Sequence, residues 1–315
     1  MKNIPLGRVD ANDETFRVTT PRRVGLIARS LAEIGLINPP LLQEKEEGGF
    51  RTISGFCRLE ACRSLGRETV PALVFAIGED PGRLALIAVW ENAVLRDLDL
   101  MEQARAVRLL ENTFGMERAA LFFTDVEGAP VSPRHLERVM GLCGLPAAVR
   151  NAAADGAILF PMATRLAELA PEDAEALAGL FSQLRLSLGK QRDVLTLASD
   201  ISRRDRIPIR WLLEEIALHV KESFPDADRN LMARMLREAL FRRRFPEFSK
   251  AKALRDEKIR ALGLSPALGW QPPEFFEEET HKLTLRFRTM EELAGLHQQL
   301  GELLSRPGAS ELLSG

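Results

Sequence analysis

Residues 53–66 read ISGFCRLEACRSLG, and this stretch decides the fold predicted for the first part of the chain. It opens at the end of a run, 50–53, whose aromatic and β-branched residues are typical of a strand. A helix is predicted over 58–65, and Gly66 ends it. Gly55 lies between strand and helix, where the lack of a side chain lets a phosphate group approach the backbone. The stretch therefore predicts a strand–glycine–helix unit suited to a phosphorylated ligand.

Strand and helix signals alternate on both sides of this unit. The helical spacing of Val24, Ile27 and Leu31 predicts a helix that follows Pro21 and ends at Gly35. The other elements predicted in this part are strands over 16–18, 41–43 and 72–76 and a helix over 81–90. Residues 1–98 are therefore predicted to form one compact, mixed α/β domain.

A mainly helical region is predicted over 99–262. Residues 100–114 form a clear amphipathic pattern, and helix follows helix to about residue 258 with short breaks at glycine and proline. Many helices joined by short loops are typical of helix-turn-helix domains. The predicted fold class is therefore α+β, with a small mixed domain followed by a helical helix-turn-helix region.

Residues 274–315 are predicted to form a short strand-and-helix unit, after a loop over 264–273. Alternation over 282–288 predicts a strand, and 290–304 predicts a helix with leucines at helical spacing. These leucines are Leu293, Leu296, Leu300 and Leu303. A lone strand is not stable by itself, so it must pair within the chain or with a second copy. We favour self-association, with pairing inside one chain as the close alternative.

The charge is unevenly distributed, although the net charge is only −2. Residues 181–260 carry 19 Lys and Arg against 12 Asp and Glu, whereas residues 101–180 carry 7 against 11. A basic block beside an acidic one favours a localised surface for phosphate groups. A solvated helical face explains the charge alone equally well.

Composition predicts a cytoplasmic protein without a membrane segment. The longest apolar run, 84–90, is far too short to cross a bilayer. The three cysteines are Cys57, Cys62 and Cys143, and none forms a CxxC pair. A disulfide framework and a cysteine-based metal site are therefore not expected.

Four segments, in this order, resemble the ParB partition family. They are LAEIGLINPPL at 31–41, ISGFCRLEAC at 53–62 with the later Gly66 and Val70-Pro71, ENAVLRDLDLMEQA at 91–104, and a stretch from Leu145-Pro146 through Asp155-Gly156 to Leu169. The resemblance covers about residues 1–215 and is carried by the order and spacing of the motifs. It implies a ParB/sulfiredoxin-like domain followed by a helix-turn-helix domain.

The resemblance implies CTP and Mg²⁺ as ligands of the first domain, where nucleotide binding closes a clamp around DNA in the family. The nucleotide-binding residues that it implies are Gly35, Asn38, Gly55, Phe56, Cys57, Arg58, Glu91, Asn92 and Arg96. Arginines can neutralise phosphates, and Glu91 and Asn92 offer the oxygen ligands that Mg²⁺ prefers. From the residues alone, an alternative stays open in which Gly55 only turns the chain and Arg58 pairs with a surface acid.

The chain departs from the family pattern at two places. The family has Glu-Arg where this chain has Phe56-Cys57, so an acid and a phosphate-binding arginine are missing. The third motif reads Glu-Asn-x-x-x-Arg, which is one residue longer than in the family and rotates a helical Arg96 by about 100°. We therefore expect nucleotide hydrolysis to be weak or absent.

The resemblance also places a DNA-recognition helix at 132–142, SPRHLERVMGL, after a helix over 117–125. Ser132 is the predicted cap with proline behind it, and Leu136, Val139 and Met140 form the buried face. The residues left outward for phosphates and guanine edges are Arg134, His135 and Arg138. A second basic helix, capped by Ser187, adds Lys190, Arg192, Arg203, Arg204 and Arg206. Without the family context, ordinary amphipathic helices remain the alternative.

The leading hypothesis is a double-stranded-DNA-binding, nucleoid-associated protein of chromosome or plasmid partition, acting as a homodimer with a ParA-like ATPase. One alternative is a transcriptional regulator with a decayed nucleotide pocket. A sulfiredoxin-like enzyme is another, because Gly55-Phe56-Cys57-Arg58 is similar to that family's Gly-Cys-His-Arg with the cysteine displaced by one. A nuclease would need metal-binding carboxylates, and Asp97 and Asp99 beside Glu91 form the one acidic cluster of that kind.

Overall fold

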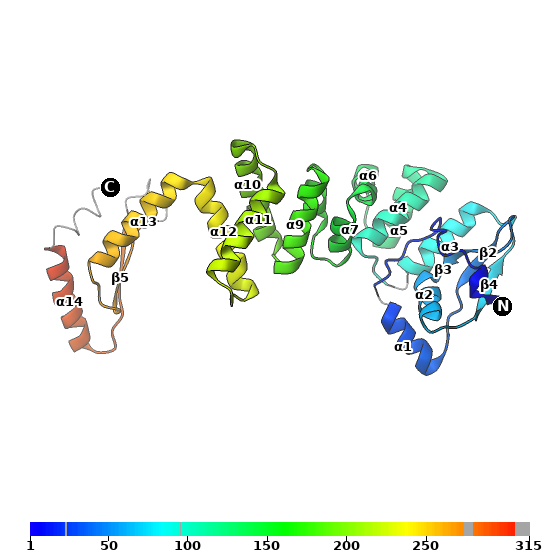
Figure 1. Ribbon diagram of the computed structural model, residues 1–315, viewed down its shortest axis with the longest axis horizontal. Helices are drawn as coiled ribbons and strands as arrows, with labels where there is room; N and C mark the ends of the chain where they lie inside the picture. Colours follow the sequence, from blue (N-terminus) through cyan, green and yellow to red (C-terminus); the bar gives the residue numbers. More distant parts are fainter. Residues whose placement is uncertain (23, 95, 274–279, 306–315) are drawn as a thin grey trace. The chain divides into compact units, whose positions relative to one another are not determined.

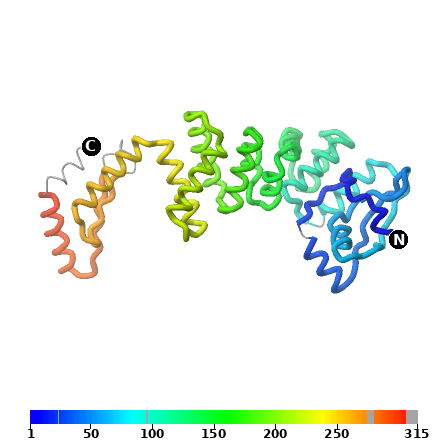
Figure 2. Tube along the Cα trace, viewed as in Figure 1, coloured from blue at the N-terminus to red at the C-terminus, as the bar shows by residue number. Residues whose placement is uncertain are grey.

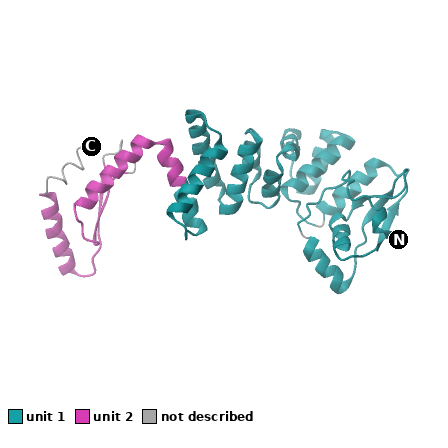
Figure 3. Cartoon of the chain, in the orientation of Figure 1, with its two compact units in different colours: residues 1–236 teal, residues 237–315 magenta. Residues whose placement is uncertain are grey.

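The computed structural model describes residues 1–22, 24–94, 96–273 and 280–305. The chain divides into two compact units, residues 1–236 and 237–315 (Figure 3). The first unit holds the whole mixed domain and most of the helical region. The predicted boundary between residues 98 and 99 therefore lies inside one compact unit, and it stays a prediction.

A four-stranded sheet forms the centre of the mixed domain. Its strands are β1 (Lys2–Pro5), β2 (Leu41–Glu44), β3 (Phe50–Ser54) and β4 (Thr69–Phe75), in the order β1-β4-β2-β3. β2 runs parallel to β4 and pairs Leu42 with Val74, whereas β1–β4 and β2–β3 are antiparallel. The strands predicted around Gly55 are thus confirmed, and β2 and β3 bring the glycine to one end of the sheet.

Helices cover both faces of this sheet. One face packs against α1 (Val24–Ile34) and α2 (Phe56–Ser64), and its shared core contains Leu31, Leu42 and Leu59. The other face packs against α3 (Pro81–Ala93), where Ile53 lies among Leu84 and Ala88. Alternate strand residues point to opposite faces, so neighbouring residues such as Leu41 and Leu42 join different cores. The predicted helices of this domain are confirmed.

The observed strands of this domain differ from the predicted ones at three places. Residues 16–18 form no strand, although Phe16 and Val18 are buried. β1 was not predicted, because four residues that end in proline give too short a pattern. β4 begins at Thr69 rather than at residue 72 and contains Pro71, which suggested a later start because proline cannot donate to a strand ladder.

The helical region follows directly. Its helices are α4 (Leu100–Phe114), α5 (Met116–Glu127), α6 (Pro133–Gly141), α7 (Ala147–Ala154), α8 (Phe160–Leu166), α9 (Pro171–Leu184), α10 (Leu188–Asp205), α11 (Ile209–Ser223) and α12 (Arg229–Arg244). Figures 1 and 2 show them following one another along the chain. α4 packs against α3, α5, α6 and α7, so it joins the mixed domain to the helices. None of the helices within the described ranges is long and apolar enough to cross a membrane.

The second unit contains α13 (Pro246–Ala261), β5 (Leu268–Gln271), β6 (Lys282–Leu285) and α14 (Met290–Leu304). β5 and β6 pair antiparallel, so the loop predicted over 264–273 is wrong at residues 268–271. The buried core gathers Leu262, Leu268, Trp270, Leu296 and Leu303. Because β6 finds its partner inside the chain, an unpaired strand is no longer a reason to expect self-association. Parts of the predicted 274–315 unit, residues 274–279 and 306–315, lie outside the described residues.

Candidate functional site

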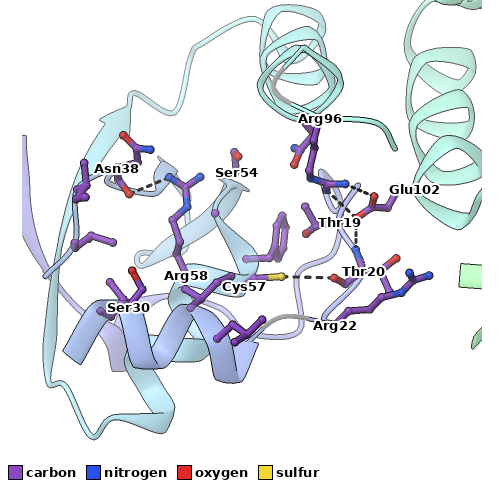
Figure 4. A pocket seen from close by; sticks show the side chains of 18 of the residues that line it. Thr19, Thr20, Arg22, Ser30, Asn38, Ser54, Cys57, Arg58, Arg96 and Glu102 are labelled. Carbon is purple, nitrogen blue, oxygen red and sulfur yellow. Dashed lines mark hydrogen bonds and ion pairs between the residues drawn. The ribbon is translucent and has the colours of Figure 1, made fainter. Parts of the chain in front are cut away.

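A pocket of about 850 Å³ lies in the first unit, where α1, α2, the end of α3 and the start of α4 meet (Figure 4). Its walls come from three stretches of the mixed domain and one of the helical region. The lining residues are Thr19, Thr20, Arg22, Leu26, Ile27, Ser30, Leu31, Gly35, Leu36, Ile37, Asn38, Ser54, Gly55, Phe56, Cys57, Arg58, Asn92, Arg96, Asp97, Asp99 and Glu102. A volume of this size is usual for a small-molecule site.

Eight of the nine residues predicted to bind a nucleotide line this one pocket. They are Gly35, Asn38, Gly55, Phe56, Cys57, Arg58, Asn92 and Arg96. The ninth, Glu91, is not among the lining residues and lies behind Arg58, with its Oε1 3.0 Å from the Arg58 Nη2. The structure therefore brings together segments that are more than fifty residues apart in the sequence.

Gly55 occupies a position that only glycine fits. Its φ of 95° is in the left-handed region, and it is the residue that precedes the first turn of α2. A Cβ atom here would lie 2.8 Å from the Pro40 Cβ and 3.1 Å from the Arg58 Nε. Because Gly55 has no side chain, the free N–H groups in the first turn of α2 can be reached from the pocket. Such N–H groups at a helix N-terminus bind anions.

Arg58 is fixed in the pocket wall by three acceptors. Its Nη1 donates to the carbonyl oxygens of Asn38, at 2.9 Å, and Pro39, at 3.3 Å, and its Nη2 pairs with Glu91. Only 21% of the side chain is exposed. Arg58 thus pairs with an acid, as the simpler interpretation expected, but the pair lies in the pocket wall and not on the surface.

Residues 16–22, which we call the strap, form a segment of the pocket wall that was not predicted from the sequence. Helix α4 holds it from the other side: the Glu102 Oε1 accepts from the Thr20 N–H at 2.9 Å, and the Arg105 Nε donates to the Val18 carbonyl at 2.8 Å. Figure 4 shows Arg58 and Asn38 on one side of the pocket and Thr20, Arg96 and Glu102 on the other. The capping pair Asp99 and Glu102 is a local signal, but nothing in it points to the strap.

Arg96 faces the pocket despite the extra residue in its motif. It makes two hydrogen bonds to the carboxylate of Glu102, whose side chain is 4% exposed. Burial alone would raise the pKa of Glu102, but hydrogen bonds from Arg96, the Thr20 N–H and the Asp99 N–H together hold it below its usual range. The same contact raises the pKa of the Arg96 guanidinium. This pair keeps a cation and an anion fixed at the pocket edge.

Arg22, on the strap, links the pocket to helix α7. One of its Nη atoms lies 3.5 Å from the Asp99 Oδ2, and its Nε lies 3.3 Å from Asp155, the residue that ends α7. A phosphate bound by Arg22 would compete with both carboxylates, because one guanidinium cannot satisfy all three groups equally. Arg22 therefore connects the pocket wall to the end of α7.

Two oxygen donors stand where Mg²⁺ was predicted. The Glu91 Oε2 is buried without a hydrogen-bond partner, and the Asn92 Nδ2 donates to the Ala88 carbonyl at 2.8 Å, which leaves the amide oxygen as an acceptor. In the described part of the chain, no three His, Cys, Asp or Glu residues gather as a metal site. Mg²⁺ is commonly bound by one or two protein oxygens together with substrate phosphates, so this pair fits Mg²⁺ only beside a nucleotide.

The enzyme alternatives find no support in the pocket. Burial raises the pKa of the Cys57 thiol, whereas a nucleophilic cysteine needs a lowered pKa. The Cys57 Sγ instead lies 3.7 Å from the Thr20 carbonyl oxygen. The carboxylate of Asp99 accepts from the N–H groups of Met101 and Glu102 and so caps α4, which leaves no acidic cluster for a nuclease among the described residues.

The predicted recognition helix is α6. The Ser132 Oγ accepts from the His135 N–H at 3.2 Å, which confirms the cap, and Leu136 and Val139 are buried while Met140 is half-buried. The residues left exposed are Arg134, His135 and Arg138, as predicted. Helix α5 packs against α6, and residues 128–132 join the two.

The second basic helix, α10, only partly matches the prediction. Ser187 is the N-cap residue, as predicted, but its side chain makes no capping hydrogen bond. Lys190 and Arg192 are exposed. Arg203 and Arg204 are paired with neighbours on the same helix, Asp200 at 3.8 Å and Asp205 at 2.7 Å, and Arg206 is the C-cap residue. The charges of Arg203 and Arg204 are therefore partly neutralised before any partner binds.

Comparisons with known proteins match the first part of this chain. The model of the ParB N-terminal domain matches residues 1–93. A probable chromosome-partitioning protein ParB of Vibrio cholerae is 33% identical over 97 residues, which cover 31% of this chain and 32% of that protein. A nucleoid occlusion protein of Listeria monocytogenes is 25% identical over 176 residues, or 56% of this chain and 60% of that protein. The chain thus spans between about a third and three fifths of the length of these curated relatives.

Among solved structures, the C-terminally truncated ParB from Caulobacter crescentus complexed with CTP-γ-S is 25% identical, covers 57% of this chain and 97% of that chain, and has a TM-score of 0.27. The assignment rests on the match of residues 1–93, which contain the sheet and most of the pocket. Residues 1–93 form a ParB N-terminal domain.

Proposed function

We propose that this chain is a DNA-binding partition protein, acting on the chromosome or a plasmid, with an N-terminal pocket that binds CTP. The observation that carries the proposal is the gathering of eight predicted nucleotide-binding residues around one pocket of about 850 Å³. A partition role is supported by the relative from Vibrio cholerae, which is named a chromosome-partitioning protein. Such a protein works on the nucleoid.

The pocket offers both positive charge and a helix N-terminus for a triphosphate. Arg22, Arg58 and Arg96 reach it from the strap, α2 and the segment after α3. Guanidinium groups bind phosphate oxygens in pairs, and the first turn of α2 beside Gly55 adds backbone donors. CTP is the nucleotide to test first because a related ParB was crystallised with a CTP analogue. Glu91 and Asn92 are the proposed Mg²⁺ ligands once phosphates are present.

Helix α6 is the proposed DNA-contacting element, with α5 as the first helix of a helix-turn-helix. Its outer face carries Arg134, His135 and Arg138, which suit phosphates and guanine edges. Lys190 and Arg192 on α10 are the next candidates for phosphate contacts. A homodimer and a ParA-like ATPase partner stay predictions from the family resemblance.

A regulator with a decayed pocket is the second candidate function, and Phe56-Cys57 favours it. These residues replace an acidic and a basic side chain of the family motif, and both line the pocket. Each pocket arginine is also already paired with a carboxylate of the chain. This candidate predicts normal DNA binding and no response to any nucleotide.

Thermal unfolding with Mg²⁺ and each of CTP, ATP, GTP and UTP tests the pocket. At about a hundredfold excess over the dissociation constant, CTP is expected to raise the unfolding temperature by roughly 5–10 °C. Arg58→Ala should abolish this shift, because Arg58 is the cation beside the start of α2. Each variant is compared with its own ligand-free unfolding temperature.

Arg29→Ala is the matched control, because Arg29 is exposed on α1 and does not line the pocket. It should keep the full CTP shift. If CTP stabilises Arg58→Ala as much as the wild type, the pocket described above is not the nucleotide site. If no nucleotide shifts the wild type, the decayed-pocket regulator replaces the proposal.

A further inference from the structure

Phe160, the first residue of α8, lies against the outer face of α6. The ring centroids of Phe160 and His135 are 5.0 Å apart with an interplanar angle of 63°, an edge-on contact. The Arg138 Cζ lies 5.3 Å from the centroid of the same ring. One half-buried aromatic side chain from a different helix therefore touches two of the three exposed residues of the proposed DNA-contacting face.

Arg138 has no carboxylate partner in the described structure. Arg134 and Glu137, its neighbours on α6, are likewise free of ion pairs within the described residues. Arg134 and Arg138 are four residues apart, and like charges at this spacing destabilise a helix slightly. Among the described residues, the ring of Phe160 is consequently the one group that restrains the Arg138 guanidinium. A cation kept unpaired but restrained is suited to an anionic partner.

We infer that Phe160 is a positioning residue for DNA contact, which holds Arg138 and His135 in the conformation that meets the duplex. The inference rests on the proposed function of α6. Its physical basis is preorganisation: ordering a long side chain on binding costs affinity, and a ring that orders it beforehand removes part of that cost. Phe160 itself touches no DNA in this account and acts through the two side chains that pack against it.

The sequence gives no hint of this role. Phe160 lies beyond α7, 22 residues after Arg138, in a stretch that reads as an ordinary start of a helix. Leu136 and Val139 anchor α6 to the core, so the helix stays in place without the ring. Removal of the ring should therefore free two side chains and leave the fold intact.

The test uses the full chain and a fluorescein-labelled duplex that the wild type enriches from a random-sequence library. Fluorescence anisotropy measures the dissociation constant, and thermal unfolding measures stability alongside. Phe160→Leu keeps an apolar side chain but no ring, and it is expected to weaken binding by about three- to tenfold. Phe160→Tyr should bind the duplex with wild-type affinity, because tyrosine keeps the ring face.

A double-mutant cycle separates positioning from a general structural effect. Phe160→Leu should weaken binding far less in a variant that carries both His135→Ala and Arg138→Ala, since the side chains that the ring positions are then gone. Trp211→Leu is the matched control, because the Trp211 ring also lies under an arginine, with the Arg210 Cζ at 5.5 Å, but on α11. It should leave the affinity for the duplex unchanged.

The outcomes distinguish the inference from the function on which it rests. Failure to enrich or bind any duplex overturns the DNA-binding proposal, and the role of Phe160 with it. Enrichment followed by equal losses from Phe160→Leu in both backgrounds, or by no loss at all in the wild-type background, overturns the role of Phe160 alone. Loss of affinity in Phe160→Tyr equal to that in Phe160→Leu also contradicts positioning by the ring.

Discussion

Glu102→Ala is expected to lower the free energy of unfolding of the ligand-free protein by about 2–4 kcal/mol. The carboxylate is buried and accepts from the Arg96 guanidinium, the Thr20 N–H and the Asp99 N–H, so its removal leaves three donors without their acceptor. Arg96 is partly exposed and can turn to water, which keeps the loss below that of a fully buried pair. Chemical denaturation of wild type and variant measures the difference.

Glu111→Ala is the matched control on the same helix, because Glu111 lies in the last turn of α4 and makes no ion pair in the described structure. It should change the stability by less than about 0.5 kcal/mol. The lowered pKa of Glu102 adds a pH signature: its contribution is present above the ordinary carboxyl pKa and is lost as the pH falls through the lowered one. Glu102→Gln should therefore lose less stability on acidification than the wild type. Equal stability of Glu102→Ala and wild type at pH 7 would show that the strap is held by other contacts.

Gly55→Ala is expected to abolish nucleotide binding and to destabilise the mixed domain. The added Cβ would lie 2.8 Å from the Pro40 Cβ, at a residue whose φ of 95° is strained for any side chain. The backbone must shift, and it carries the first turn of α2 and Arg58 with it. Calorimetric titration with CTP and Mg²⁺ measures the loss of binding, and circular dichroism checks that the variant is folded.

Gly25→Ala is the control for this substitution. Gly25 lies inside α1 and has open space around the position of a Cβ, so alanine there should stabilise the helix by up to about 1 kcal/mol and leave CTP binding intact. A folded Gly55→Ala variant that binds CTP like the wild type would contradict the close-approach account of Gly55. If Gly55→Ala does not fold, Arg58→Ala gives the same test of the pocket without backbone strain.

The parts of the fold decided by local chemistry were predictable. The unit around Gly55 combines a strand pattern, a glycine and a helical pattern within residues 50–66, and all three are confirmed. Helix α4 was predicted with its observed ends from its amphipathic pattern, and in the structure Asp99 caps it and Gly115 follows it. β1 and β5 were not predictable in this way, since each is a four-residue strand that is stabilised by its pairing partner.

The sequence predicted most of the segments that line the pocket but missed the strap. The family motifs placed eight residues that do line the pocket, including Arg96, whose extra motif residue suggested another direction. The strap was missed because Thr20 and Glu102 are 82 residues apart, and no local pattern reports such a contact. Glu91, a predicted Mg²⁺ ligand, does not line the pocket; its Oε1 pairs with Arg58, and its Oε2 has no hydrogen-bond partner.

We propose that this chain binds both CTP and DNA and that CTP binding changes its affinity for DNA. The structural route is Arg22, which lines the pocket and pairs with Asp155 at the end of α7. Coupling between two sites commonly amounts to about fivefold or more in affinity and works in both directions. Such coupling is measured with both CTP and DNA present.

The most direct measurement is the dissociation constant of the enriched duplex, with and without CTP and Mg²⁺, for the wild type and for Arg58→Ala. We predict that CTP changes the dissociation constant of the duplex by at least about fivefold in the wild type and leaves it unchanged in Arg58→Ala. Identical DNA affinity with and without CTP, in a wild-type protein that calorimetry shows to bind both, would contradict it.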